Sequence, residues 1–243
     1  MMAQSITTEV LTDQERLQNF NSLTHLVETY APHFSALIDR MKNDRVCSDG
    51  FSDKQVNYFG LFNAPVAKGV HHAYCGGLIA HYLEMWNYWK LIKPTIPESE
   101  EKDSHLSDER ILVGIIMHDL HKCWCSYIAD EKVPSGINYG QHPTDQLMTP
   151  NQKSLCIAQR FGINLDVEQL NALNNSEGGY AKSPPRCQSV LSKVLYILDE
   201  LSSNVLARSM TGNWFDIRNT GSPTEESLDP THCEYLPKGD SDV

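Results

Sequence analysis

The chain has 243 residues, 40% of them hydrophobic and 21% charged, an ordinary globular composition that can bury a core without disulfides. Its longest apolar run, Ile111 to Met117, is far shorter than the ~20 residues of a membrane-spanning helix, and the N-terminus lacks the basic and apolar blocks of a secretory signal. The net charge of −11 disfavours nucleic acid as a partner and favours a small substrate whose charge is met locally.

Helical periodicity dominates the N-terminal third. Apolar residues recur at near-helical spacing over residues 9–30, Pro32 interrupts the pattern, and residues 33–42 predict a second helix. Residues 43–68 are rich in Asp, Ser, Asn and Gly and predict mostly loop. A strong amphipathic helix is predicted over residues 77–91 and ends at Lys93-Pro94.

The second half also predicts helices with clear start signals. Ser107 caps a helix that runs to about residue 120, and residues 122–148 predict irregular structure with a short hairpin. Thr149-Pro150 begins a capping box for a helix that Gly162 ends. A short helix over residues 166–173 and a long one over residues 187–210 follow, and residues 221–243 read as a weakly ordered acidic tail.

Because strand signals are nearly absent, the pattern predicts an all-α fold. We expect an N-terminal helical extension (residues 1–64), a helical bundle around a site (65–210) and an acidic tail (211–243). The seven cysteines include no CxxC pair, which favours reduced thiols in the cytoplasm over a zinc ribbon.

Ionisable residues fall on stripes that should be apolar in three of these helices. They are His81 in the first, His118 and Asp119 in the second, and Asp199 in the third, where Ser202 shares its face. A lone histidine there is usually a hydrogen-bonded core residue, but an unpaired buried carboxylate costs several kcal/mol or more. No Lys or Arg lies on these stripes, so a metal ion is the economical partner.

Two imidazoles and two carboxylates suit an octahedral divalent ion. Mn²⁺ is our first choice, with Fe²⁺, Co²⁺, Ni²⁺ or Mg²⁺ as alternatives. Such an ion leaves positions open for water and substrate, activates water for attack on phosphorus, and offsets charge on phosphate oxygens.

Three blocks carry a resemblance to a known family: HHAYCGGLIAHYLEM from His71, GIIMHDLHK from Gly114 and LYILDELSSNV from Leu195. Their order, His…His-Asp…Asp, resembles the HD-domain superfamily of metal-dependent phosphohydrolases. The version HHxxxGGLxxH is most similar to the subgroup that contains bacterial 3′-to-5′ exoribonucleases of the YhaM type. The similarity covers roughly residues 65–208.

The resemblance implies roles for particular residues. It implies that His81, His118, Asp119 and Asp199 are metal ligands, with Asp119 also counted as catalytic. It implies that Lys122 lies near the phosphate. We further predict that His72 contacts the phosphate or the scissile oxygen, and that His71 and Arg186 contact substrate.

The chain departs from the family pattern at two places. His121 stands where the family commonly has the glycine of HDxGK, and is either an added substrate contact or a solvated loop residue. Ser176-Glu177 stands where some members have a His-His pair of a second metal site. Glu177 is therefore either a ligand or water-orienting group, or an exposed loop carboxylate.

The predicted reaction is hydrolysis of a phosphoester or phosphoanhydride of a nucleotide or nucleotide-like substrate. One alternative is a 3′-to-5′ exonuclease on single-stranded RNA or DNA, although the chain shows no N-terminal OB-type module to grip a strand. Another is a non-catalytic nucleotide-binding protein on the same scaffold. Aromatic residues on the first ligand helix, such as Trp86 and Trp89, could stack on a base but are more typical of core packing.

Overall fold

The computed structural model describes residues 11–42, 60–66, 71–97, 105–124, 127–129, 137–139, 147–175 and 188–205. The predictions made for Glu177, Arg186 and the acidic tail lie outside these residues. Every helix in the described part is too short or too polar to cross a bilayer.

The N-terminal helices form as predicted, with later starts. Helix α1 spans Asp13–Tyr30 and begins with a capping box, in which the Thr12 hydroxyl and the Glu15 side chain each bond the other residue's backbone N–H. A 3₁₀ turn, Pro32–Phe34, leads into α2, Ser35–Met41. One face of α1 is buried through Phe20, Leu23 and Val27.

Two helices form the centre of the molecule. Helix α4, Gly77–Ile92, is followed by a 3₁₀ turn, Lys93–Thr95, and is buried on most of its surface. Helix α6, Asp108–Asp119, is capped by Ser107 and continues into a 3₁₀ turn, Leu120–Trp124. Tyr82 on α4 donates a hydrogen bond of 2.9 Å to the backbone oxygen of Ile116 on α6, which ties the two helices together.

The remaining elements follow in sequence order. Strands β1, Tyr127–Ala129, and β2, Ile137–Tyr139, pair antiparallel as the predicted hairpin. Helix α7, Pro150–Gln159, has the predicted Thr149 capping box, and Gly162 follows it with φ of 68°. Helix α8 spans Val167–Asn175, and α9, Val190–Glu200, continues into a π-helical turn, Leu201–Val205.

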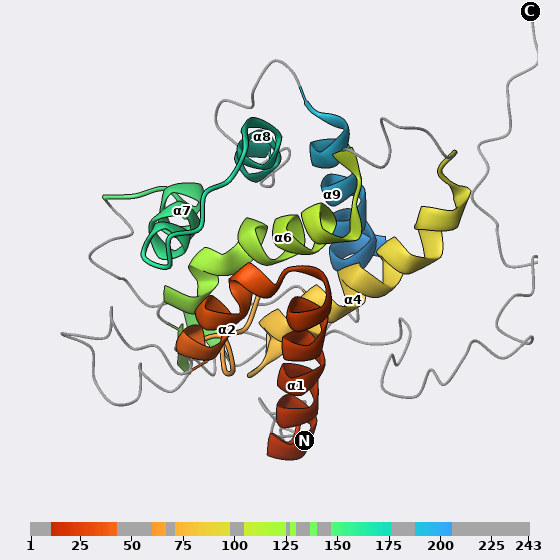
Figure 1. The fold of residues 1–243 in the computed structure, drawn as a ribbon. Coiled ribbons are helices and arrows are strands. Elements are labelled where there is room, and N and C mark those ends of the chain that lie inside the picture. The colour runs from red at the N-terminus through yellow and green to blue at the C-terminus, as the bar shows by residue number, and fades with distance from the viewer. Residues whose placement is uncertain are drawn as a thin grey trace, which may run out of the picture.

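Helix α6 runs through the middle of the fold, with α1 and α2 on one side and α7 and α8 on the other (Figure 1). It also contacts α4 and α9, and one hydrophobic core extends from Phe20 on α1 to Leu198 on α9. The all-α prediction is therefore confirmed, with the β1–β2 pair as a small addition. The N-terminal helices share this core, and the domain boundaries stay a prediction.

Gly114 explains how α9 approaches α6 so closely. A Cβ at this position would overlap Cδ1 of Leu195 on α9. The missing side chain therefore lets the two helices pack at short range, and it brings Asp199, one turn after Leu195, toward the C-terminal end of α6.

Candidate metal centre

The four residues predicted as metal ligands converge from α4, α6 and α9. Nε2 of His81 lies 3.3 Å from Nε2 of His118 and 3.3 Å from Oδ1 of Asp199. Oδ2 of Asp119 lies 3.4 Å from Nε2 of His118 and 4.0 Å from Nε2 of His81, and Nε2 of His118 lies 4.0 Å from Oδ1 of Asp199. Side chains from positions as far apart as 81 and 199 thus share one centre.

These separations suit a common ion. A divalent ion that binds nitrogen and oxygen at about 2.1 Å in an octahedron holds adjacent ligand atoms roughly 3.0 Å apart and opposite ones roughly 4.2 Å apart. Three of the measured pairs lie near the first value and two near the second. His81, His118 and Asp119 alone already form a group whose ligand atoms lie within 4.8 Å of one another. The donor set and the spacing therefore fit a divalent metal ion.

The backbone orients one of the two imidazoles. Nδ1 of His118 lies 2.6 Å from the carbonyl oxygen of Ile115, an oxygen that only accepts hydrogen bonds. Nδ1 therefore carries the hydrogen, and the Nε2 lone pair faces the cluster. This is the usual way in which a protein sets the tautomer of a ligating histidine.

Burial and neighbouring charges set the protonation of the cluster. Burial, with His72 and His118 nearby, holds the pKa of His81 well below its usual range, so the ring is neutral at neutral pH. Burial alone would raise the pKa of Asp119, but Lys122 and the surrounding histidines outweigh it and lower that pKa. Burial raises the pKa of Asp199, and Asp119 adds to that effect.

The cluster is closed on one side and open on the other. The side chain of His81 is 0% exposed, whereas that of Asp199 is 24% exposed. The cluster therefore meets solvent on the side of Asp199.

The 3₁₀ turn after α6 places two further predicted site residues. Nζ of Lys122 lies 2.6 Å from Oδ2 of Asp119 and so puts a positive charge directly beside the cluster. The His121 backbone N–H donates to the Ser154 hydroxyl on α7, and burial lowers the pKa of the His121 ring to about 3. His121 is half-buried in this turn, over which α7 packs, and the choice between a substrate contact and a solvated residue stays open.

The loop before α4 brings His71 and His72 to the same region. The ring centroids of both lie 5.2 Å from that of His81, and their Nδ1 atoms lie 3.2 Å apart. Burial, His72 and Lys122 lower the pKa of His71 to about 4, while Asp199 and Asp119 oppose that shift. A neutral, half-buried His71 therefore lies within electrostatic reach of both carboxylates.

The two glycines of the HHxxxGGLxxH motif, Gly76 and Gly77, are each required for a different structural reason. Gly76 has φ of 79°, a left-handed conformation that favours glycine, at the start of α4. A Cβ at Gly77 would overlap the backbone oxygen of His72. His72 also has a positive φ, of 47°. The two glycines thus allow the His71–His72 segment to pack against helix α4.

The structure adds two buried residues that the predicted site did not include. Glu84 on α4 lies with Oε2 3.1 Å from Nε2 of His72, and Ser202 in the π-helical turn lies with Oγ 2.8 Å from Nδ1 of His81. The sequence does place Ser202 on the same helix face as Asp199, one turn later, whereas Glu84 lies on a helix that is buried on most sides and no stripe marks it. The aromatic residues Tyr82 and Trp89 are buried in the core, as the packing interpretation expects.

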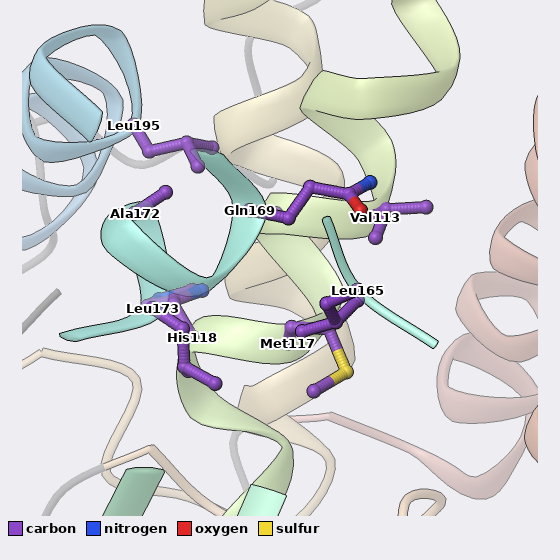
Figure 2. A pocket seen from close by; sticks show the side chains of 9 residues that line it. Val113, Met117, His118, Leu165, Gln169, Ala172, Leu173 and Leu195 are labelled. Atoms are coloured by element: carbon purple, nitrogen blue, oxygen red, sulfur yellow. The ribbon is translucent and has the colours of Figure 1, made fainter. Parts of the chain in front are cut away.

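A small cavity lies behind His118, between α6, α8 and α9 (Figure 2). Its walls are largely apolar, with Met117 and Leu165 on one side and Ala172 and Leu195 on the other (Figure 2). It has room for about one water molecule, far less than a substrate needs. It therefore belongs to the packing that supports the cluster from behind.

Comparison with known proteins gives one relative of known activity. The chain is similar to dihydroneopterin 2′,3′-cyclic phosphate phosphodiesterase from Methanocaldococcus jannaschii, with 22% identity over 169 residues. The alignment covers 70% of this chain and 62% of that protein, so the chain spans less than two thirds of its relative's length. No protein-family model and no solved structure matches. The likeness supports a phosphoester hydrolase in general terms and leaves the substrate open.

Proposed function

We propose that this chain is a metal-dependent phosphohydrolase of the HD type, with His81, His118, Asp119 and Asp199 as the metal ligands. The observation that carries the proposal is the convergence of these four side chains at separations of 3.3 to 4.0 Å. Three separate helices contribute to a donor set that suits Mn²⁺ first, with Fe²⁺, Co²⁺, Ni²⁺ or Mg²⁺ as alternatives. A bound ion of this kind supplies an acidified water and positive charge for a phosphoryl oxygen.

The surrounding side chains suit a phosphorylated substrate. Lys122 holds its ammonium 2.6 Å from Asp119, where charge that develops on a phosphoryl oxygen would be offset. His71 is neutral at neutral pH and half-buried near the two aspartates, so its ring can exchange a hydrogen bond with a substrate oxygen. His72 and His121 complete the histidine-rich surroundings, and their contact with substrate remains part of the proposal.

The favoured substrate is a nucleotide or a nucleotide-like phosphoester. The relative is named for cleavage of a 2′,3′-cyclic phosphate, which is a small phosphodiester of this kind. The net charge of −11 disfavours a long nucleic-acid strand, whose backbone the protein would repel on average. Cyclic phosphodiesters are therefore the first compounds to test.

The test is a metal-supplemented activity screen. Purified protein is incubated with Mn²⁺ and with 2′,3′-cyclic nucleotides, 3′,5′-cyclic nucleotides, mononucleotides and a single-stranded oligonucleotide. We expect turnover of a small phosphoester that a chelator abolishes and that Asp119→Ala abolishes. Asp108→Asn, at the opposite end of α6, is the matched control and retains activity.

Other outcomes separate the alternatives. Laddered products from the oligonucleotide, with binding that weakens as salt rises, would indicate an exonuclease. Metal binding without turnover of any compound would indicate a non-catalytic nucleotide-binding protein. Activity that survives Asp119→Ala would refute the proposed site.

A further inference from the structure

The two histidine ligands are anchored differently behind the cluster. Nδ1 of His118 faces a backbone carbonyl, and that contact by itself defines the tautomer. Nδ1 of His81 instead faces the hydroxyl of Ser202 at 2.8 Å. A hydroxyl both donates and accepts, so this contact alone allows the hydrogen to lie on either nitrogen of His81.

Glu84 removes that ambiguity. The Ser202 hydroxyl forms a short hydrogen bond to Oε2 of Glu84, which lies one turn after His81 on α4. Oε2 of Glu84 is the acceptor in this hydrogen bond, so the single hydroxyl hydrogen of Ser202 points to Glu84. The oxygen of Ser202 is then an acceptor toward His81, and Nδ1 of His81 must carry the hydrogen.

Burial makes this arrangement persistent. His81 and Ser202 are 0% exposed and Glu84 is 8% exposed, so water competes weakly for these hydrogen bonds. Glu84 receives a second partner from Nε2 of His72 at 3.1 Å. The contact also anchors a residue in a left-handed backbone conformation, with φ of 47°, which is uncommon outside glycine.

We infer that Glu84 and Ser202 are positioning residues that fix the hydrogen of His81 on Nδ1 and so keep its Nε2 lone pair directed at the metal. The inference rests on the proposed function, because it assigns these residues to the same metal centre. It assigns Nε2 of His72 to holding Glu84 in place. Groups behind a metal ligand that set its tautomer and orientation commonly affect metal affinity about 10- to 100-fold.

The first test measures the tautomer directly in the wild-type protein without metal. Protein labelled with ¹⁵N-histidine is studied by long-range ¹H–¹⁵N NMR, and the His81 signals are assigned with His81→Gln. We expect a neutral ring with its hydrogen on Nδ1. A hydrogen on Nε2 would overturn the inference, whatever the protein's activity.

The second test measures Mn²⁺ affinity by titration calorimetry. We expect Ser202→Ala and Glu84→Leu each to weaken binding about 10- to 100-fold. Glu84→Gln should lose less, since the amide oxygen can still accept the Ser202 hydrogen. The double variant Glu84→Leu/Ser202→Ala should bind no more weakly than the weaker single variant, because both changes remove the same interaction.

The matched control is Ser192→Ala on α9. Ser192 is also a buried serine, and its hydroxyl has no hydrogen-bond partner among the described residues. Its substitution should leave Mn²⁺ affinity unchanged. If Ser202→Ala lowers the melting temperature but binds Mn²⁺ within threefold of wild type, its role is only structural and the inference is wrong.

The two proposals fail in distinguishable ways. A wild-type protein that binds no divalent ion contradicts the proposed function, while the NMR measurement on the same metal-free protein still decides the tautomer. A wild-type protein that binds Mn²⁺ with the wrong His81 tautomer contradicts only the positioning role.

Discussion

Each end of α6 carries an aspartate, half-buried Asp108 at the N-terminal end and buried Asp119 at the C-terminal end. The two carboxylates differ in the side chains that surround them. At the N-terminal end, Asp108 accepts hydrogen bonds from Trp89 at 2.7 Å and from Lys93 at 2.8 Å, with Lys90 at 3.4 Å. At the C-terminal end, Asp119 lies among His81, His118 and Asp199, with Lys122 as its cation.

The partners of each aspartate distinguish a structural carboxylate from a candidate metal ligand. Two lysines and an indole satisfy Asp108, and its position at the helix N-terminus is favourable for negative charge. Around Asp119, a second carboxylate and two imidazole nitrogens face the same point, so the ligand atoms outnumber what Lys122 can balance. We therefore propose the second end of α6 as the metal site and expect the first end to contribute to stability.

Replacing each of the two aspartates by alanine, in separate variants, should change the protein most. Asp119→Ala should abolish Mn²⁺ binding and phosphoesterase activity, because it removes a ligand from the centre of the cluster. Asp108→Ala should keep both but lower the free energy of unfolding by about 1–3 kcal/mol, because it leaves the indole and ammonium donors without their acceptor. Calorimetry and urea unfolding measure the two effects, and equal behaviour of the variants would contradict the comparison.

A second variant is expected to disturb only the proposed metal site, by displacing the backbone of the loop before α4. Gly77→Ala should weaken Mn²⁺ binding strongly, because the new Cβ would overlap the His72 carbonyl oxygen and displace the loop against His81. Gly162→Ala is the control, since its Cβ would meet no atom within 4 Å although φ is positive. The control should lose roughly 1 kcal/mol of stability or somewhat more and no metal affinity. Unchanged metal affinity in Gly77→Ala would show that the loop does not support the centre.

A third variant changes Gly114, in the middle of α6, where α9 packs closely against it. Gly114→Ala should lower the free energy of unfolding by about 1–3 kcal/mol, because the added methyl group overlaps Leu195 and pushes α9 away. Since α9 carries Asp199, Mn²⁺ affinity should fall as well, by less than in Asp119→Ala. Chemical denaturation and calorimetry test this, and a stabilised protein would mean that the cavity behind His118 absorbs the methyl group.

A further effect concerns the dependence of stability on pH in the metal-free protein. Burial lowers the pKa of His71 to about 4 and of His121 to about 3, below the unfolded value of 6.5. Between these values the unfolded chain binds protons that the folded one does not, so stability falls as pH drops from 6.5 toward 4. His71 should contribute on the order of 1–3 kcal/mol to this loss.

Urea unfolding from pH 7 to pH 4.5 measures this loss, and His71→Gln should flatten the slope. The Asp108 end should not contribute, because Lys93 and Trp89 lower the pKa of that carboxyl, against the effect of burial, to below its ordinary value of 3.8. A pH-independent stability over this range would show that the histidines are not held neutral by the fold.

The sequence was sufficient for the helices and for the four converging residues. Ionisable residues on otherwise apolar stripes at His81, His118, Asp119 and Asp199 made a shared cation the simplest explanation, and helix periodicity fixed which faces they occupy. Start signals such as Ser107 and Thr149 placed helix ends within a residue or two.

Other features depend on tertiary packing and could not be predicted. Glu84 lies on a helix that is buried on most sides, so no single stripe marked it, and its partner Ser202 is 118 positions away. The partial burial of His121 follows from the packing of α7 over the turn after α6, which no local pattern specifies. Lys90 and Lys93, which balance the charge of Asp108, come from the end of α4, and no local pattern predicted these ion pairs.

The proposed metal centre is best tested with a crystal of the protein grown with Mn²⁺ and measured at a wavelength where manganese scatters anomalously. We predict one strong anomalous peak about 2.0–2.3 Å from Nε2 of His81, Nε2 of His118, a carboxylate oxygen of Asp119 and one of Asp199. Full occupancy of the protein by Mn²⁺ with the peak elsewhere, or no peak at these four atoms, would contradict the assignment of the metal centre.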